Sequence, residues 1–144
     1  LLVVQSGVLN RSDGSGQRFA KAITGAWYET MGQLTGSGEA ATRALRGIAA
    51  ASEDSVDSYK EQLRTTYLFS KPQAAVDFAS NSQFKQHMEL VRQFCFHHGL
   101  LGKNLASVDD VGILYPDNTI QGKKDRVRLR FDNSYMQAAG KGQL

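Results

Sequence analysis

The segment SQFKQHMELVRQFCFHHG, residues 82–99, carries the clearest helical signal in the chain. Its apolar side chains recur every three or four residues, which is the spacing of one helix face. Asn81 or Ser82 suits the N-cap, and Gly99 suits the left-handed residue that closes a helix. We therefore expect residues 82–98 to form the best-packed helix of the protein. The predicted buried face comprises Phe84, Met88, Val91, Cys95 and His98, widened by Leu90 and Phe94.

Four further helices are predicted upstream of this segment. The first places Ile23, Trp27 and Met31 on one side and ends at the Thr-Gly-Ser-Gly break of residues 35–38. Ser37 is expected to cap the second helix, whose thin face permits close approach of a neighbouring helix. That face comprises Ala41, Ala44, Leu45, Ile48 and Ala49.

The third predicted helix begins at Ser55, which has the side chain of an N-cap. Its apolar face comprises Val56, Tyr59, Leu63 and Tyr67. Ser70 followed by Pro72 marks the start of a fourth helix, because proline is tolerated in the first helical turn.

Short strands are expected at the two ends of the chain. LLVV, residues 1–4, reads as a strand that is buried on both faces. VGILY, residues 111–115, is predicted to be a strand, followed by a turn and a return strand at residues 119–122. VRLRF, residues 127–131, alternates apolar and basic residues, which is typical of a strand with one face in solvent. A helical turn is predicted at residues 107–110, and Asp132 is expected to cap a last helix before a loose tail at residues 138–144.

The predicted fold class is therefore α/β and predominantly helical, with about five helices plus a few short strands. We expect residues 1–144 to form a single domain, because no linker or internal repeat divides them. Within it, residues 1–102 hold a strand plus helices, and residues 103–144 form a strand-rich C-terminal segment.

Composition excludes few classes of protein. The net charge of +3 and pI near 9.1 tolerate an anionic partner without requiring one. Cys95 is the only cysteine, so an internal disulfide is impossible, and no apolar run approaches the roughly 20 residues that span a bilayer. The chain begins at Leu1 without Met, so we expect a mature form, a trimmed form or a fragment.

The residues give no positive argument for catalysis, a metal or a cofactor. His87, His97 and His98 lie near Cys95, but their spacing supplies too few ligands for a zinc site. The glycines form neither a dinucleotide-binding nor a P-loop pattern. We expect no catalytic residue, no metal and no cofactor.

Basic side chains share one face of the last predicted strand. Arg126, Arg128 and Arg130, with Lys123 and Lys124 before them, could grip phosphate or nucleic acid. Aspartates are interspersed and no aromatic residue alternates with the arginines on their face, so we favour a solvated face and expect no nucleic-acid binding.

Trp27 lies in the densest aromatic and acidic cluster, Trp-Tyr-Glu at residues 27–29. It could stack on a ligand, but its spacing with Ile23 and Met31 favours a place in the core. Trp27 is the single residue that we name as a candidate ligand contact.

Several stretches resemble the C-terminal part of bacterial ABC-transporter periplasmic substrate-binding proteins. The branch is the nitrate/taurine/thiamine-precursor-like one, including members labelled urea-type transporters. The specific stretches are GAWYETM at residues 25–31 and LRFDNSYMQ at residues 129–137, and weaker likeness covers nearly the whole chain. The resemblance implies part of a type II periplasmic-binding-protein-like lobe, a non-catalytic function and a small solute as ligand.

The resemblance also implies that most of the ligand cleft is built by a part of the family that precedes the matched region. No ligand contact of the family is therefore transferred to this chain. The alternative function is a stand-alone helical module that serves oligomerisation or partner binding. The expected location is periplasmic by family resemblance, or cytoplasmic if the chain is encoded as a stand-alone protein.

The expected partner is a second copy of the chain. Leu1, Leu2, Val3 and Val4, together with exposed helix faces, would form the homo-oligomer contact, because an unpaired apolar strand edge tends to associate.

Overall fold

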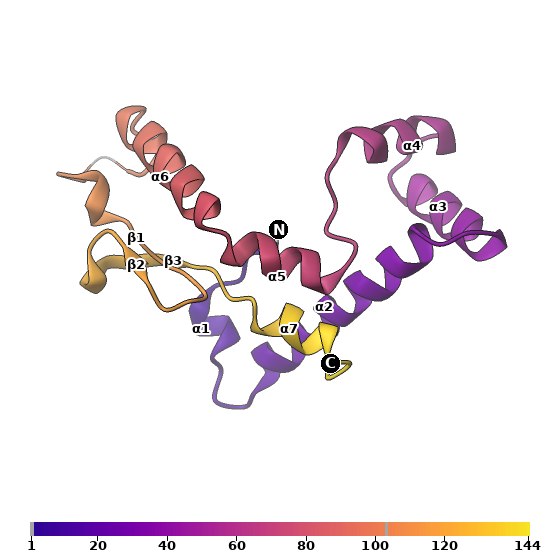
Figure 1. The fold of residues 1–144 in the computed structure, drawn as a ribbon, viewed down its shortest axis with the longest axis horizontal. Helices are drawn as coiled ribbons and strands as arrows, with labels where there is room; N and C mark the ends of the chain where they lie inside the picture. The colour runs from indigo at the N-terminus through magenta and orange to yellow at the C-terminus, as the bar shows by residue number, and fades with distance from the viewer. Residues whose placement is uncertain (1, 103) are drawn as a thin grey trace. The chain divides into compact units, whose positions relative to one another are not determined.

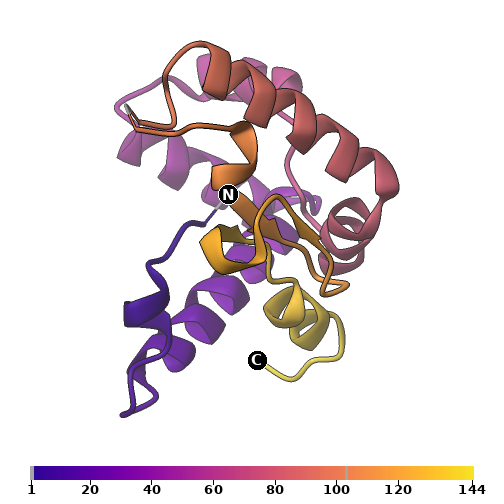
Figure 2. The same ribbon diagram turned by 90° about the vertical axis from the view of Figure 1, so that its left-hand side faces the viewer.

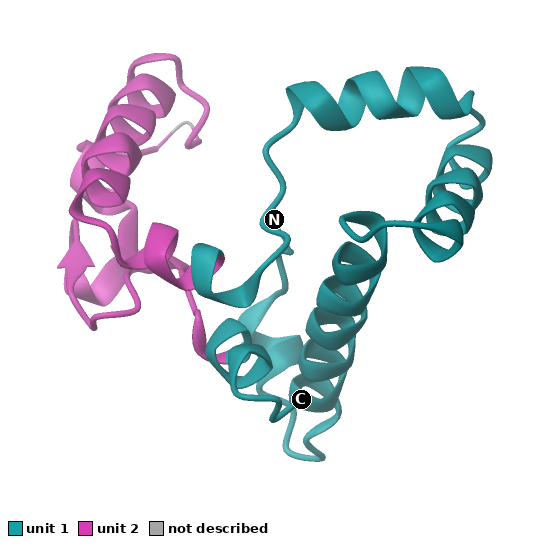
Figure 3. Ribbon diagram, turned by 45° about the vertical axis from the view of Figure 1, so that its right-hand side comes forward, with its two compact units in different colours: residues 1–74, 135–144 teal, residues 75–134 magenta. Residues whose placement is uncertain are grey.

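The computed structural model describes residues 2–102 and 104–144, which form two compact units (Figures 1 and 3). The first unit comprises residues 1–74 and 135–144, and the second comprises residues 75–134. The division between the units falls inside α5 (Pro72–Ser80), after residue 74. Over the described residues the fold is predominantly helical, with seven α-helices and a small mixed sheet of three strands.

The first unit is built from helices. α1 (Ser6–Leu9) leads into α2 (Ser15–Leu34), α3 (Glu39–Ala51) and α4 (Val56–Thr65), and α7 (Ser134–Gly140) closes it. Gly16 lets α2 approach α1, since a Cβ there would lie 2.0 Å from the carbonyl oxygen of Val8. Among the described residues of this unit, the buried apolar side chains are Ala20, Met31 and Ala49. Its core is therefore thin.

The second unit contains the three-stranded sheet and the long helix α6, residues 82–97 (Figure 2). Most of α5 (Pro72–Ser80) and α6 (Ser82–His97) precede two single turns and three strands: η1 (Val108–Asp110), β1 (Gly112–Leu114), β2 (Ile120–Gln121), η2 (Lys124–Arg126) and β3 (Val127–Arg130). The strand order is β2-β1-β3, with β1 antiparallel to β2 and parallel to β3. The central strand β1 and the residue that follows it supply the most enclosed large side chains of this unit, Ile113 and Tyr115.

An aromatic cluster fills the core of the second unit. Ile113 and Tyr115 are each 2% exposed. The Phe84 ring of α6 lies 4.8 Å from the Phe131 ring and 6.1 Å from the Tyr115 ring, both edge to face. These contacts fasten the start of α6 to the sheet.

Most predicted helices and caps are confirmed. Ser55 accepts a hydrogen bond from the Ser58 amide at 3.1 Å, and Asn81 accepts one from the Gln83 amide at 2.9 Å. Pro72 is the first residue of α5, and Gly99 has a φ of +68°. The thin face of α3 is also as predicted, since Ala49 is buried and its four predicted companions are half-buried.

The strands predicted between residues 111 and 131 are confirmed as well. β1 and β2 form the predicted hairpin, the turn at η1 is present, and β3 alternates half-buried and exposed residues. Asp132 accepts a hydrogen bond from the Ser134 amide at 2.9 Å at the start of the last helix. That helix continues to Gly140, so the predicted loose tail is shorter than expected.

Residues 2–4 do not form the predicted buried strand; Leu1 lies outside the described residues. Leu2 and Val3 are 58% and 73% exposed, and no strand of the described sheet pairs with them. An apolar run alone does not make a buried strand, because the backbone groups also need a neighbouring strand.

Two smaller predictions in the first unit are wrong. Gly38, not Ser37, precedes the first residue of α3, and no side chain caps that helix. Tyr67 lies beyond the end of α4 and is 78% exposed, because the chain becomes extended at Thr66. The helical period of the face therefore stops at Leu63.

The predicted face of α6 is wrong in its orientation. Leu90, Val91 and Phe94 are 68%, 49% and 56% exposed, and His98 is exposed too. Arg92 is instead the buried residue of this helix. The inward face shares only Phe84, Met88 and Cys95 with the prediction, and all three are half-buried.

Candidate functional site

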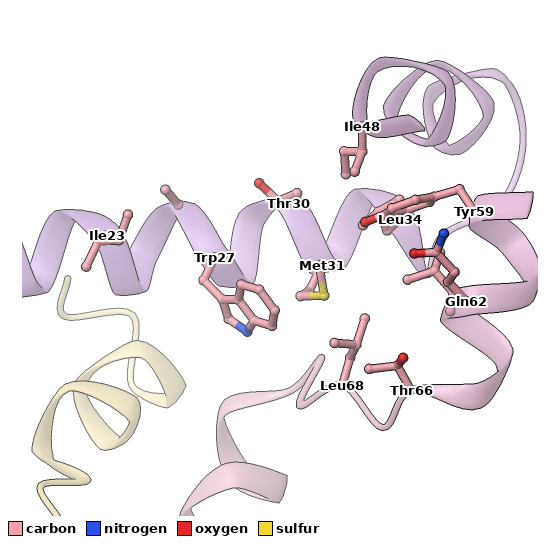
Figure 4. Close-up of a pocket in the computed structure, with 12 residues that line it drawn as sticks. Ile23, Trp27, Thr30, Met31, Leu34, Ile48, Tyr59, Gln62, Thr66 and Leu68 are labelled. Carbon is pink, nitrogen blue, oxygen red and sulfur yellow. The ribbon is translucent and has the colours of Figure 1, made fainter. Parts of the chain in front are cut away.

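The first unit contains an apolar groove of about 570 Å³ between α2, α3, α4 and the connector that follows α4 (Figure 4). We call this the Trp27 groove. One wall is the side of α2, the end is closed by α3 and α4, and Thr66 and Leu68 come from the connector. Its lining residues are Ile23, Ala26, Trp27, Thr30, Met31, Leu34, Ile48, Tyr59, Gln62, Leu63, Thr66 and Leu68.

Trp27 is held in a fixed place on the wall of this groove. Its indole Nε1–H donates a hydrogen bond to the carbonyl oxygen of Phe69 at 3.0 Å. This bond fastens the connector to α2 and occupies the only donor of the ring. The ring is 42% exposed, so it offers its face rather than its polar edge to a bound molecule.

Helical spacing explains why α2 presents this wall. Ile23, Trp27 and Met31 recur every four residues, so they lie along one side of α2. Met31 is 4% exposed and forms the floor, whereas Ile23 and Trp27 are open to solvent at 38% and 42%. The groove is therefore deepest near Met31 and shallower toward Ile23.

Five side chains in the lining carry hydrogen-bonding groups: Trp27 and Gln62, whose N–H groups already donate to Phe69 and Asp54, and Thr30, Tyr59 and Thr66. None of the twelve lining residues is charged. A charged ligand would lose its hydration without gaining an opposite charge, which is costly in an apolar site. The arrangement therefore suits an uncharged molecule with an apolar body and a hydrogen-bonding group.

Part of this lining follows from the sequence. Ile23, Trp27, Met31, Ile48, Tyr59 and Leu63 all lie on predicted apolar faces. The expectation that Trp27 belongs to the core is not what the structure shows, since the ring is almost half exposed. Leu68 and Thr66 were not predicted, because the path of a connector has no periodic signal in the sequence.

The second unit contains a buried ionic network around Arg92, which is 4% exposed. Its guanidinium donates to Glu89, to Asp109 at 2.9 Å and to the carbonyl oxygen of Val108 at 3.0 Å. These bonds join α6 to η1. The network holds two elements together, and its charges are already paired, so we assign it a structural role.

Asp110 is a second buried charge of that unit. It accepts hydrogen bonds from Lys123 at 2.6 Å and from the amides of Ala106 and Ser107. The hydrogen bond from Lys123, above all, lowers the pKa of the Asp110 carboxyl below its usual value. Asp110 therefore stays ionised, and its bond to Lys123 connects η1 to the residue that precedes η2.

The other residues singled out in the sequence are not brought together into a site. His97 and His98 are exposed at the end of α6, and Cys95 is half-buried on its inward side. In the described part of the chain, no group of three or more His, Cys, Asp or Glu side chains is placed to hold a metal ion. Arg128 and Arg130 lie on the exposed side of β3, as the alternation predicted. Arg126 does not share that strand face, because it lies in η2 and forms an ion pair with Asp110 at 3.4 Å.

Comparison with known proteins gives no relative. The chain matches no protein-family model, no curated protein and no solved structure. Among the described residues, none of the helices is both long and apolar enough to cross a bilayer.

Proposed function

We propose that this chain has a non-catalytic, small-solute-binding role, as a relative or part of an ABC-transporter solute-binding protein. The observation that supports this most is the Trp27 groove, an apolar hollow with a fixed aromatic wall. Small-molecule sites in proteins are typically concave and mostly apolar, with a few polar groups that orient the ligand. The groove has this composition.

The lining narrows the class of solute. Without a charged side chain, the groove disfavours carboxylates and ammonium compounds. A very small polar solute such as urea would leave most of the apolar wall in contact with water. An uncharged amide that carries a short alkyl chain suits both parts of the lining. Its chain would contact Trp27 and Met31, and its N–H groups would donate to the side-chain oxygen of Gln62, whose nitrogen already donates to Asp54.

Fluorescence of Trp27 tests the proposal directly, because it is the only tryptophan of the chain. Three probes are compared: hexanamide, urea and hexanoate. We expect hexanamide to give a saturable change at about millimolar concentration, which is the weak affinity of a small apolar ligand, and the other two to give none.

A matched pair of variants locates the binding. Leu68 lines the groove, whereas its neighbour Tyr67 is 78% exposed and does not. Leu68→Asn should weaken hexanamide binding at least about fivefold, because it removes apolar contact from the wall. Tyr67→Asn should leave it unchanged. Equal binding of hexanoate, or equal loss in both variants, would contradict the proposal.

A further inference from the structure

The polarity of α6 is reversed relative to that of an ordinary surface helix. Its three charged residues, Lys85, Glu89 and Arg92, all lie on the side that faces the rest of the second unit. Arg92 is bound to Glu89 and Asp109, and the Lys85 ammonium is bound to Asp117 and Thr119. A surface helix normally turns such residues toward solvent. The inward side of α6 is therefore the charged one.

The outward side of α6 has an apolar centre and carries no Asp, Glu, Lys or Arg. Leu90, Val91 and Phe94 form its centre and are 68%, 49% and 56% exposed. The ring of His98 stacks on Phe94 with centroids 4.1 Å apart, which widens the aromatic surface. We call this the outer face of α6; its members are Gln83, Gln86, His87, Leu90, Val91, Phe94, His97 and His98, all of them exposed.

We propose that the outer face of α6 binds the same face of a second copy of this chain, with the two helices antiparallel. Two antiparallel copies can be centred on a point between residues 90 and 91, the middle of the exposed apolar residues. In that register Leu90 lies opposite the partner's Val91, and His87 lies opposite the partner's Phe94. Gln83 then lies opposite the partner's His98. The apolar and aromatic pairs therefore lie at the centre of this two-fold contact, and the polar Gln83 and His98 meet at its ends.

The charges of α6 favour a second copy over other partners. Two identical faces without formal charge can meet without repulsion, whereas an acidic or basic partner would find no opposite charge there. A lipid surface is also disfavoured, because helices that lie on membranes usually expose Lys and Arg, and here both basic residues point inward.

The size of the face sets the strength of the contact. A 16-residue helix is about 24 Å long, so one helix pair buries an area at the low end of specific interfaces. We therefore expect a reversible dimer with a dissociation constant of about 10–100 µM. The dimer contact uses residues of the second unit alone, so it is independent of the Trp27 groove.

Sedimentation equilibrium of the full chain between 1 and 300 µM tests this. The mean mass should rise from 15.8 kDa toward twice that value. Leu90→Glu should remain monomeric over the whole range, since it places a charge at the centre of the contact. Phe19→Glu, which changes a 59% exposed residue of the first unit, should dimerise as the parent does. Circular dichroism checks that both variants are folded.

Cross-linking tests the orientation in a Cys95→Ser background. Residue 90 lies next to the two-fold axis, so Leu90→Cys should link to its own equivalent through a short bis-maleimide. The two copies of residue 83 lie about 22 Å apart in the antiparallel pair, so Gln83→Cys should not link.

Three results would overturn the proposal. A folded parent chain that stays monomeric at 300 µM excludes the contact. Dimerisation that survives Leu90→Glu places the contact elsewhere. Equal cross-linking through residues 83 and 90 shows a parallel pair and overturns the register.

Discussion

Gly122 occupies a position in the second unit where a side chain would be strained and crowded. Its φ is +84°, and a Cβ would lie 2.9 Å from Nη2 of Arg92 and 3.0 Å from the carbonyl oxygen of Val111. Gly99 has a similar φ of +68° with nothing within 4 Å of a Cβ. A side chain at Gly99 would meet backbone strain alone, whereas one at Gly122 would meet both backbone strain and crowding.

Gly122→Ala should lower the free energy of unfolding more than Gly99→Ala does. We expect about 1 kcal/mol at Gly99 from the left-handed backbone alone, and about 2–3 kcal/mol at Gly122, where Arg92 must also move. Urea denaturation of both variants measures the difference. Equal losses would show that Arg92 does not enclose Gly122.

Asp117 gives the stability of the second unit a dependence on acid pH. A hydrogen bond from Lys85 and one from the Thr119 hydroxyl lower the pKa of this carboxyl from 3.8 to about 2. Its ionised form is therefore favoured in the folded state, so it stabilises fully above about pH 4. This contribution is lost as the pH falls from 3.8 toward 2.

Asp117→Asn should flatten the pH dependence of the unfolding midpoint between pH 4 and pH 2. Asp125→Asn, which changes another exposed carboxylate of the same unit, should retain the parental slope. Thermal denaturation across this range provides the measurement. An unaltered slope in Asp117→Asn would show that the Lys85 contact does not persist in solution.

At the scale of the element, the orientation of α6 predicts that truncating two apolar residues lowers the free energy of unfolding by very different amounts. The sequence pattern places Phe94 in the core, with a cost of about 3–5 kcal/mol for Phe94→Ala if the ring is enclosed. Since Phe94 is 56% exposed, we now expect a loss within about 0.5 kcal/mol. Ile113→Ala, at a residue 2% exposed on β1, should cost about 2–5 kcal/mol.

Denaturation at low micromolar concentration compares these two variants in the monomer. A large loss for Phe94→Ala together with a small one for Ile113→Ala would return α6 to the orientation that its apolar period predicts. That outcome would also remove the outer face of α6 as a binding surface.

Local signals predicted the elements better than their orientation. Ser55 and Asn81 cap the helices they were expected to cap, because an N-cap depends only on nearby backbone amides. The burial of Arg92 depends on Glu89 and on Asp109, 17 residues away, so the helical period could not reveal it. The predicted strand at residues 2–4 failed for a related reason, since a strand depends on a distant partner.

In the candidate site, too, the parts set by local sequence were predicted and the parts set by distant contacts were not. The side of α2 that carries Trp27 and Met31 follows from helical spacing, and Trp27 was named as a candidate contact. The groove also needs Leu68, which the connector brings against α2 through the bond between Trp27 and Phe69. A contact between residues so far apart in the chain has no local signature.

At the scale of the whole molecule, few of the described apolar residues are fully enclosed. Among the described residues, six apolar side chains are buried, and three of those are alanines. Fourteen large apolar side chains are exposed, from Leu2 to Leu144. Where exposed apolar residues lie together, as they do at the centre of the outer face of α6 and on the side of α2 that lines the Trp27 groove, such surface usually marks contact with a ligand or another protein. This distribution supports a binding role, and it gives no argument for a catalytic one.

A backbone NMR titration with hexanamide tests the central claim, that the Trp27 groove binds an uncharged apolar solute. The amide signals of all residues report on both units in one experiment. We predict saturable shifts for residues of α2, α3, α4 and the connector, and for the indole N–H of Trp27, with residues 75–134 unchanged. Shifts centred on residues 75–134, or no saturable shift at all, would contradict the claim.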